Sequence, residues 1–449
     1  MENTAQSIAD DSMAIRSKRP SLYRRLAGNR YLVHNIIVLI ATVATGAINY
    51  LLNPVLIYLL GLAQYSKFIS LIGLLTVVLT PTQVIGVIIA KYASSLGAAG
   101  RYDQLNDLFR RLTVILLPVG IVCAIIFAAF SGQIAAFLHL QSTQQVLIIS
   151  IALVLAFIGP VSGGAVQGLE RFSWYSINSL ATPVLRLVLI IVLVDLGFGI
   201  NGALIGLVLA AALTYFLSLV PLRDLLRGSR APSGSLRPLV SYSVTAIIAL
   251  ASTTLLMNAD TILAGHFLTA QKAGLYDGLA VIGRTVLFVS ASVAAVMFPR
   301  VAALHERGER TIRVVLQALL GVFVLSLSVE AVFLVAPRVV IRILSHNPAL
   351  ETVADQLVWY GLAMLLLAMA QALINYFLSI GSRLFVIAVG ACCALQAVLI
   401  VVRHASVAQF VQDVVIANGL LFAILFVLLF VSAQGVNTRP LSGFRRSAA

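Results

Sequence analysis

The chain has 449 residues, of which 60% are hydrophobic and only 10% are charged. Soluble proteins carry about 45–50% apolar and about 25% charged residues, so this composition excludes a water-soluble domain and predicts an all-α membrane protein. The net charge of +14 is spread over short segments between apolar stretches rather than collected in one basic domain. That distribution follows the positive-inside rule and argues against a nucleic-acid partner.

The N-terminal segment is polar and basic, and residues 1–30 are predicted to form a cytoplasmic tail. A secretory signal has an apolar region of about 7–15 residues, followed by small residues at a cleavage site. The apolar stretch that begins at Tyr31 is much longer. We therefore expect an uncleaved first membrane span.

Apolar stretches long enough to cross a bilayer recur along the whole chain. The hydrocarbon core is about 30 Å thick, which a helix of about 20 apolar residues spans. Twelve such stretches are predicted, at 33–59, 65–92, 110–130, 144–166, 173–194, 199–220, 239–266, 275–299, 312–335, 353–379, 384–402 and 407–432. The sequence thus predicts twelve transmembrane helices.

A polar segment in the middle of the chain, 221–238, separates six of these stretches from the other six. We predict an N-lobe at 31–220, a cytoplasmic linker at 221–238, a C-lobe at 239–432 and a cytoplasmic tail at 433–449. Because each lobe holds an even number of spans, both lobes start on the same side of the bilayer and form a parallel repeat. Two six-helix lobes that face each other predict a central cavity and hence a transporter.

Lysine and arginine are distributed unequally between the two sides of this predicted bundle. Most of the 30 basic residues fall on the side that carries both termini. The opposite side holds only Lys67, Lys272, Arg338, Arg342 and Arg403. By the positive-inside rule, both termini are cytoplasmic and the protein is a multi-pass protein of the cell membrane.

Three local motifs resemble a known family. Asn258–Tyr276 reads NADTILAGHFLTAQKAGLY, and Ala165–Phe172 reads AVQGLERF and is followed by Asn178 and Arg186. The run LGFGINGALIG at 196–206 leads into the next span. Together with the span layout, these motifs resemble the lipid-linked oligosaccharide flippases of the multidrug/oligosaccharidyl-lipid/polysaccharide exporter superfamily.

The resemblance implies a flippase that moves a polyprenyl-diphosphate-linked oligosaccharide across the membrane by alternating access, for surface polysaccharide biosynthesis. Drug-exporting members of the superfamily commonly carry a coupling carboxylate in the first span, and the stretch 33–59 has none. A cation-coupled antiporter of drugs or small metabolites remains the alternative. A membrane enzyme is disfavoured, because the loops are short and none carries paired carboxylates.

Two arginines fall inside predicted spans, where a charge costs roughly 2.5–3.5 kcal/mol on insertion scales. Arg186 lies about 18 Å along the helix from Trp174, near the midplane. Its guanidinium could bind the diphosphate through paired hydrogen bonds, or it could clamp neighbouring helices. Arg284 is a second candidate for the diphosphate, and it could equally form an ion pair with Asp260.

Other polar residues in the spans are candidates for binding, coupling and gating. Amides in predicted spans could bind sugar hydroxyls, or simply bond neighbouring helices. These candidates are Asn49, Asn53, Asn178 and Asn258 for the sugar, Asp260 and Glu330 for a coupling H⁺ or Na⁺, and Gln167, Glu170 and Arg171 for a cytoplasmic gate. No His, Cys and Asp cluster has metal spacing, and we expect no cofactor. Membrane lipid and the lipid-linked oligosaccharide are the expected partners of a monomer.

Overall fold

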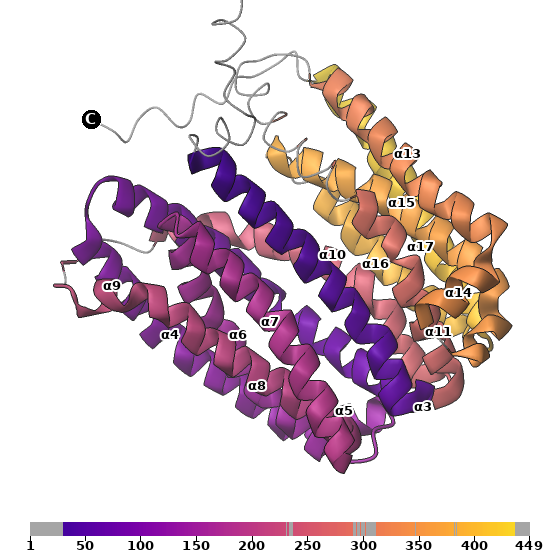
Figure 1. The fold of residues 1–449 in the computed structure, drawn as a ribbon. Helices are drawn as coiled ribbons and strands as arrows, with labels where there is room; N and C mark the ends of the chain where they lie inside the picture. Colours follow the sequence, from indigo (N-terminus) through magenta and orange to yellow (C-terminus); the bar gives the residue numbers. More distant parts are fainter. Residues whose placement is uncertain are drawn as a thin grey trace, which may run out of the picture.

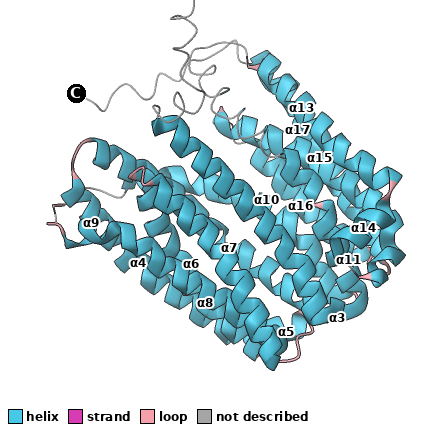
Figure 2. Cartoon of the chain, viewed as in Figure 1, coloured by secondary structure: helices cyan, strands magenta, loops and turns pink. Residues whose placement is uncertain are grey.

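The computed structural model describes residues 30–435, apart from 230, 233–236, 291–292, 294–296, 298–300, 302–310, 346, 381 and 383. At residues 30–40, 43, 237–249 and 432–435 the structure describes the backbone but not the side chains. Most of both predicted tails, the middle of the linker and the end of the predicted span 275–299 therefore lie outside the described residues. Within the described residues every regular element is a helix (Figure 2), which confirms the predicted all-α class.

The first half of the chain forms a group of helices that we call the N-lobe. They are α3 (Arg30–Ala98), α4 (Tyr102–Ala129), α5 (Ser131–Phe137), α6 (Gln144–Gly168), α7 (Phe172–Leu193), a π-helical turn (Val194–Phe198) and α8 (Gly199–Leu219). Helix α3 is interrupted at Gly61, whose φ of 72° is non-helical. Glycine adopts this left-handed conformation without a steric penalty, so α3 bends there into two segments that return across the lobe.

The second half of the chain forms the C-lobe. Its elements are α10 (Arg237–Phe267), α11 (Ala270–Gly283), α13 (Ile312–Val335), α14 (Pro337–Ser345), a 3-10 turn (Pro348–Val353), α15 (Ala354–Ser379), α16 (Leu384–Val402) and α17 (Val407–Gly435). The bounds of α10, α13, α15, α16 and α17 agree closely with the predicted apolar stretches, whereas α11 ends at Gly283, inside the predicted stretch 275–299, and α14 lies in a predicted loop. Apolar length, rather than helix propensity, therefore positions these elements.

Among the described residues, 9 helices are long and apolar enough to cross a membrane. Two of them, Ala44–Ala98 and Phe172–Arg227, have 55 and 56 residues, and each contains a backbone break at a glycine. Helix α10 is not counted with them, because its first half lies among residues whose side chains are not described. The multi-spanning architecture is confirmed, and the count of twelve stays a prediction.

The two lobes lie side by side and meet along α3 (Figure 1). Helices α3, α4, α6, α7 and α8 pack on one another, and so do α10, α11, α13, α15, α16 and α17. The contact between lobes is made mainly by α3 against α10 and α11. We call the end where α3 and α4 begin and α17 ends the terminal end, and the end with the Gly61 bend, α5 and α14 the far end.

The first part of the predicted linker is folded against the N-lobe. After α8, a 3-10 turn (Val220–Leu222) leads into α9 (Arg223–Arg227), and Leu222 and Leu225 are buried in the N-lobe core. The Asn106 amide donates to the carbonyl oxygens of Gly228 at 2.9 Å and Ser229 at 3.2 Å. The lobe and linker boundaries themselves stay predictions.

Candidate functional site

The lobes are in close contact at the far end. Gly265 packs directly against Ser70, and Gly274 packs against the backbone of Leu62, so neither glycine could carry a Cβ without a shift. The Ser70 hydroxyl also donates to the carbonyl oxygen of Thr261 at 3.1 Å. Glycines at such positions let helices of the two lobes approach closely in lipid.

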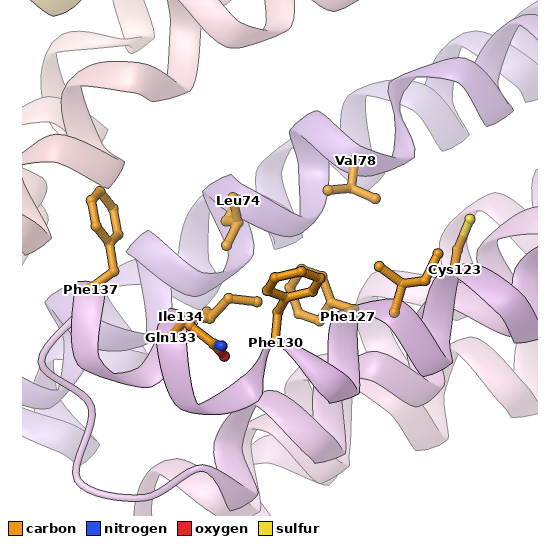
Figure 3. A pocket seen from close by; sticks show the side chains of 9 residues that line it. Leu74, Val78, Cys123, Phe127, Phe130, Gln133, Ile134 and Phe137 are labelled. Atoms are coloured by element: carbon orange, nitrogen blue, oxygen red, sulfur yellow. The ribbon is translucent and has the colours of Figure 1, made fainter.

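An apolar groove of about 560 Å³ lies beside this contact on the N-lobe. Figure 3 shows Leu74 and Val78 of α3 on one side of it and Phe127 and Phe130, at the end of α4, on the other. Phe137, at the edge of the groove, stacks on His266 of the C-lobe with ring centroids 4.1 Å apart. The groove offers almost no polar group, so it suits a hydrocarbon chain rather than a sugar or a phosphate.

The predicted pairing of Arg284 with Asp260 is present. The Arg284 Nη2 lies 3.3 Å from Asp260 Oδ1 and donates to Thr261 Oγ1 at 2.9 Å and to the carbonyl oxygen of Met257 at 2.8 Å. The other carboxylate oxygen of Asp260 accepts from Tyr276 at 2.7 Å and from Tyr360 at 3.0 Å. Both members of the pair therefore have satisfied polar atoms.

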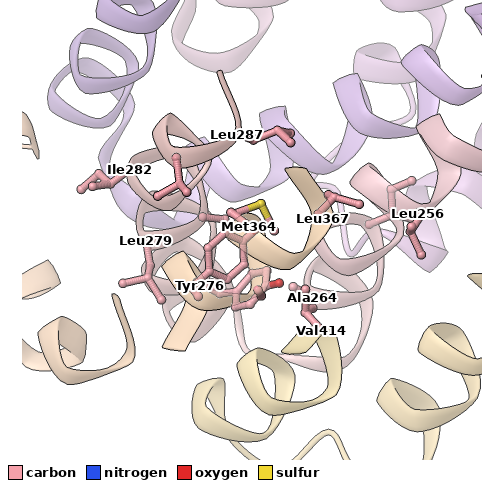
Figure 4. Close-up of a cluster of buried hydrophobic side chains, with 14 of the residues drawn as sticks. Leu256, Ala264, Tyr276, Leu279, Ile282, Leu287, Met364, Leu367 and Val414 are labelled. Carbon is pink, nitrogen blue, oxygen red and sulfur yellow. The ribbon is translucent and has the colours of Figure 1, made fainter. Parts of the chain in front are cut away.

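Apolar side chains enclose this ion pair. Asp260 is 2% exposed and both tyrosines are 0% exposed, and Figure 4 shows Tyr276 among Leu256, Met364 and Leu367. The gap beside the pair has no room for a water molecule. Of the two alternatives that the sequence left open for Arg284, this structure has the ion pair.

Arg186 is in the opposite situation. It lies on α7, two turns after Ser179, whose carbonyl oxygen accepts from Thr45 of α3 at 3.1 Å. Since two turns return to the same face of a helix, Arg186 lies on the face of α7 that is turned toward α3. Its Nε is buried without a hydrogen-bond partner, and no acidic side chain in the described part of the chain forms an ion pair with it.

The four candidate asparagines lie near the same inter-helix surfaces. Asn49 is exposed, and Asn53 accepts from the Tyr65 hydroxyl at 3.1 Å. The Asn178 Oδ1 on α7 is buried without a partner. Asn258 lies against Gly73 at the contact of α10 with α3, and its amide donates to a carbonyl oxygen one turn earlier at 2.8 Å.

The remaining candidates lie elsewhere. Glu330 packs on Gly361 between α13 and α15, inside the C-lobe, and its Oε2 is buried without a partner. Gln167, Glu170 and Arg171 form the turn between α6 and α7 at the terminal end, where Gln167 and Glu170 are exposed. Coupling by Glu330 and gating by this turn stay predictions.

A second cavity lies inside the C-lobe, with a volume of about 370 Å³. It is lined by apolar groups and by five polar side chains, Thr253, Thr254, Ser290, Gln371 and Asn375. The Oε1 of Gln371 has no hydrogen-bond partner. Uncharged donors and acceptors beside an aromatic ring, here Phe288, suit a neutral hydroxylated ligand.

The sequence analysis missed two buried acids. Asp413 on α17 forms an ion pair with Arg403. The other is Asp277 on α11. It is 0% exposed, and neither carboxyl oxygen has a hydrogen-bond partner. The signal was available, because Asp277 is a carboxylate inside the predicted span 275–299, directly after the Gly-Leu-Tyr that opens it. No group of three or more His, Cys, Asp or Glu side chains that could hold a metal occurs among the described residues.

The chain matches one family model and several solved structures. The model of polysaccharide biosynthesis proteins matches residues 101–353, more than half of the chain. An inward-facing multidrug resistance transporter of the MATE family in the MOP superfamily has a TM-score of 0.70 at 14% identity, over 87% of this chain and 95% of that chain. No curated protein matches the chain by sequence.

Two further solved structures cover almost the whole chain. The MATE multidrug transporter DinF-BH has a TM-score of 0.66 at 16% identity, over 94% of this chain and 98% of that chain. The lipid II flippase MurJ in an inward closed conformation has a TM-score of 0.65 at 14% identity, over 90% and 94%. The chain therefore belongs to the family of polysaccharide biosynthesis proteins and has the helical fold of MOP superfamily transporters.

Proposed function

We propose that the protein is a flippase that carries a polyprenyl-diphosphate-linked oligosaccharide across the cytoplasmic membrane by alternating access. The observation that carries this proposal is Arg186 in a membrane-spanning helix of the N-lobe, whose Nε is buried without a hydrogen-bond partner and which forms no ion pair with the described residues. Membership of a polysaccharide biosynthesis family supports the substrate class. The likeness of the fold to a lipid II flippase supports the movement of a lipid-linked substrate.

The physical reason is that a buried charge needs a partner. Insertion of an arginine at the centre of a span costs roughly 2.5–3.5 kcal/mol, and a bound anion offsets that cost. A diphosphate offers oxygens that a guanidinium binds through two parallel hydrogen bonds. Arg284 does not serve in this conformation, since Asp260 and Thr261 occupy its donors.

The sugar part of the substrate needs a different environment. Among the described residues that line it, the C-lobe cavity carries amides and hydroxyls but no charged side chain. Such a site favours sugar hydroxyls over phosphate, because it supplies hydrogen bonds without a counter-charge. We propose that the oligosaccharide reaches this cavity while the diphosphate lies near Arg186.

Alternating access requires that the lobes close one end of the molecule at a time. From the positive-inside rule we expect the terminal end to be cytoplasmic, and the contacts of Gly265 and Gly274 with α3 lie at the far end. We propose that the conformation described here is closed toward the outside. A lipid-linked substrate would then enter from the cytoplasmic leaflet.

An antiporter of cationic drugs is the second candidate, because two of the similar structures are multidrug transporters. An unpaired arginine repels a cation, which favours the anionic lipid-linked substrate. The two functions differ in one measurement, the export of a cationic dye in response to a proton or sodium gradient. Such export by the purified protein in liposomes would favour the antiporter.

A deletion strain tests the proposed function in cells. We expect it to accumulate polyprenyl-diphosphate-linked sugar on the inner leaflet and to lose the corresponding surface polysaccharide. The wild-type chain and a variant of an exposed far-end lysine, Lys272→Ala, should restore delivery, and Arg186→Ala should not. Normal surface delivery in the deletion strain, with no second flippase present, would contradict the proposal.

A further inference from the structure

Asp277 lies between the two lobes, in the second turn of α11. Across the contact stands Ser66 of α3, whose buried hydroxyl faces the carboxyl group of Asp277. One turn of α11 away, Gly274 packs on the backbone of Leu62. The carboxyl group of Asp277 is therefore enclosed only while α3 and α11 remain in contact.

Other charged or titratable groups near Asp277 are already committed to other partners. Tyr65 of α3 donates to Asn53. On α10, Asp260 is paired with Arg284 of α11. Of the other neighbouring elements, α15 contributes Tyr360, which bonds to Asp260, and α14 contributes Arg342, which pairs with Glu351. The 3-10 turn and α17 contribute apolar side chains, Leu350 against Gly278 and Phe410 against Tyr276.

An ionised carboxylate in this position would lack a counter-charge of its own, because Arg284 is paired with Asp260. Transferring such a group from water into an apolar interior is so unfavourable that it binds a proton instead. A bound metal cation is disfavoured beside this carboxylate, because hard cations take several oxygen ligands. Asp277 and Ser66 supply only two side chains. The enclosed state of Asp277 is therefore the neutral, protonated one.

Separation of α3 from α11 at the far end would bring Asp277 into contact with water. A hydrated carboxyl group loses its proton at neutral pH. Glu330 differs in this respect, since it lies between α13 and α15 within one lobe and movement of the lobes does not expose it. Among the buried acids described, Asp277 thus lies at a contact that movement of the two lobes would open.

We propose that Asp277 is a proton-binding site that couples closure of the far end to the uptake of one proton from the side on which that end opens. This inference rests on the alternating access of the proposed function. A lower pH on that side would then favour the return of the empty flippase to its inward-facing state, and the proton would leave to the same side when the far end opens again. By linkage, the ratio of open to closed far ends should rise about tenfold per pH unit while the exposed carboxyl group is ionised.

The test is a distance measurement between spin labels on the two lobes. Labels at Gln141 and Gln271, both exposed at the far end, report its opening in a chain whose Cys123, Cys392 and Cys393 are replaced by alanine. The full-length protein is measured in nanodiscs without substrate from about pH 5.5 to about pH 8.5. We expect the long-distance population to grow with pH.

Two variants and one control decide the outcome. Asp277→Asn, which imitates the neutral acid, should hold the far end closed and remove the pH dependence. Ser66→Ala should raise the open population at every pH, and that population should depend on pH as steeply as in the wild type. The control Asp355→Asn, at an exposed acid of the same end, should behave as the wild type.

Three results would overturn the proton site. The first is a long-distance population that does not depend on pH in the wild type. The second is an Asp277→Asn variant in which this population depends on pH as in the wild type. The third is a change of this population with Na⁺ at constant pH. An Asp277→Asn variant with the wild-type pH dependence would assign that dependence to another group. Because no substrate is present, each of these results leaves the translocation of lipid-linked sugar standing as a separate question.

Discussion

Two arginines lie inside membrane-spanning segments of this protein, and their surroundings differ. Arg284 in the C-lobe is 16% exposed and bonds to Asp260, Thr261 and a carbonyl oxygen. Arg186 in the N-lobe has a buried Nε without a partner and no acidic neighbour among the described residues. A charge in a span is therefore not by itself a sign of a ligand site, and what matters is whether the protein already satisfies it.

The comparison assigns different roles to the two lobes. In the C-lobe, the tyrosines and the ion pair join α10, α11 and α15 into one buried unit. In the N-lobe, Arg186 on α7 forms no ion pair with any described residue, and we propose that its partner is the substrate. The variants below test this division, in order of decreasing effect on the protein.

Arg284→Ala should have the largest effect, on folding itself. It leaves the Asp260 carboxylate buried at 2% exposure without a counter-charge, and breaking a buried pair in this way costs about 3–5 kcal/mol. Thermal unfolding of the purified protein in detergent measures the loss. The double variant Arg284→Gln with Asp260→Asn should recover much of the lost stability. An Arg284→Ala protein as stable as the wild type would show that the buried ion pair does not stabilise the C-lobe.

Arg186→Ala should leave the fold intact and weaken substrate binding. The variant loses a buried charge that has no partner, so its melting temperature should equal or exceed that of the wild type. A charge-assisted hydrogen bond contributes about 1.5–3 kcal/mol, so the Kd for a polyprenyl diphosphate should rise about 10- to 100-fold. Calorimetry in detergent measures this change, and Arg186→Lys should show an intermediate loss. A large drop in stability would instead place Arg186 in an interhelical clamp.

Gln371→Leu tests whether the C-lobe cavity binds the sugar part of the substrate. The variant removes one unpartnered amide from the C-lobe cavity. A neutral hydrogen bond contributes about 0.5–1.5 kcal/mol, so the affinity for the complete substrate should fall about 2- to 10-fold. The affinity for the sugar-free polyprenyl diphosphate is the matched control and should not change. An equal loss for both ligands would remove the cavity from sugar binding.

Arg342→Ala should have the smallest effect. Arg342 donates to both carboxylate oxygens of Glu351, at 2.9 Å and 3.1 Å, but its side chain is 73% exposed. Water screens such surface pairs, so neither melting temperature nor transport should change measurably. A clear loss of stability would show that exposure is a poor guide to the strength of ion pairs in this protein.

The sequence predicted the helical architecture well because apolar length in lipid leaves few alternatives. The bounds of α6, α13 and α16 lie within a few residues of the predicted stretches. The folded start of the linker was not predicted, since its two buried leucines sit among arginines, serines and glycines. Gly61, by contrast, lies between two stretches that the sequence correctly kept separate.

The candidate site was only partly predictable. Sequence spacing brought Asp260 and Arg284 within reach of each other, but it could not show that Tyr276 and Tyr360 complete their bonding. The place of Asp277 inside a predicted span was visible in the sequence, but its burial against α3, which is far away in the chain, was not. Whether a polar side chain in a span is satisfied is a property of tertiary packing, which periodicity and composition do not contain.

The most direct test of the central claim is translocation by the purified protein in liposomes. A defined polyprenyl-diphosphate oligosaccharide with a labelled sugar is placed in the bilayer, and its appearance in the opposite leaflet is followed by enzymatic removal of the label. The wild type and Arg342→Ala should move the lipid at the same rate, and Arg186→Ala should not exceed protein-free liposomes. Wild-type rates in Arg186→Ala, or no translocation by the wild type, would contradict the account.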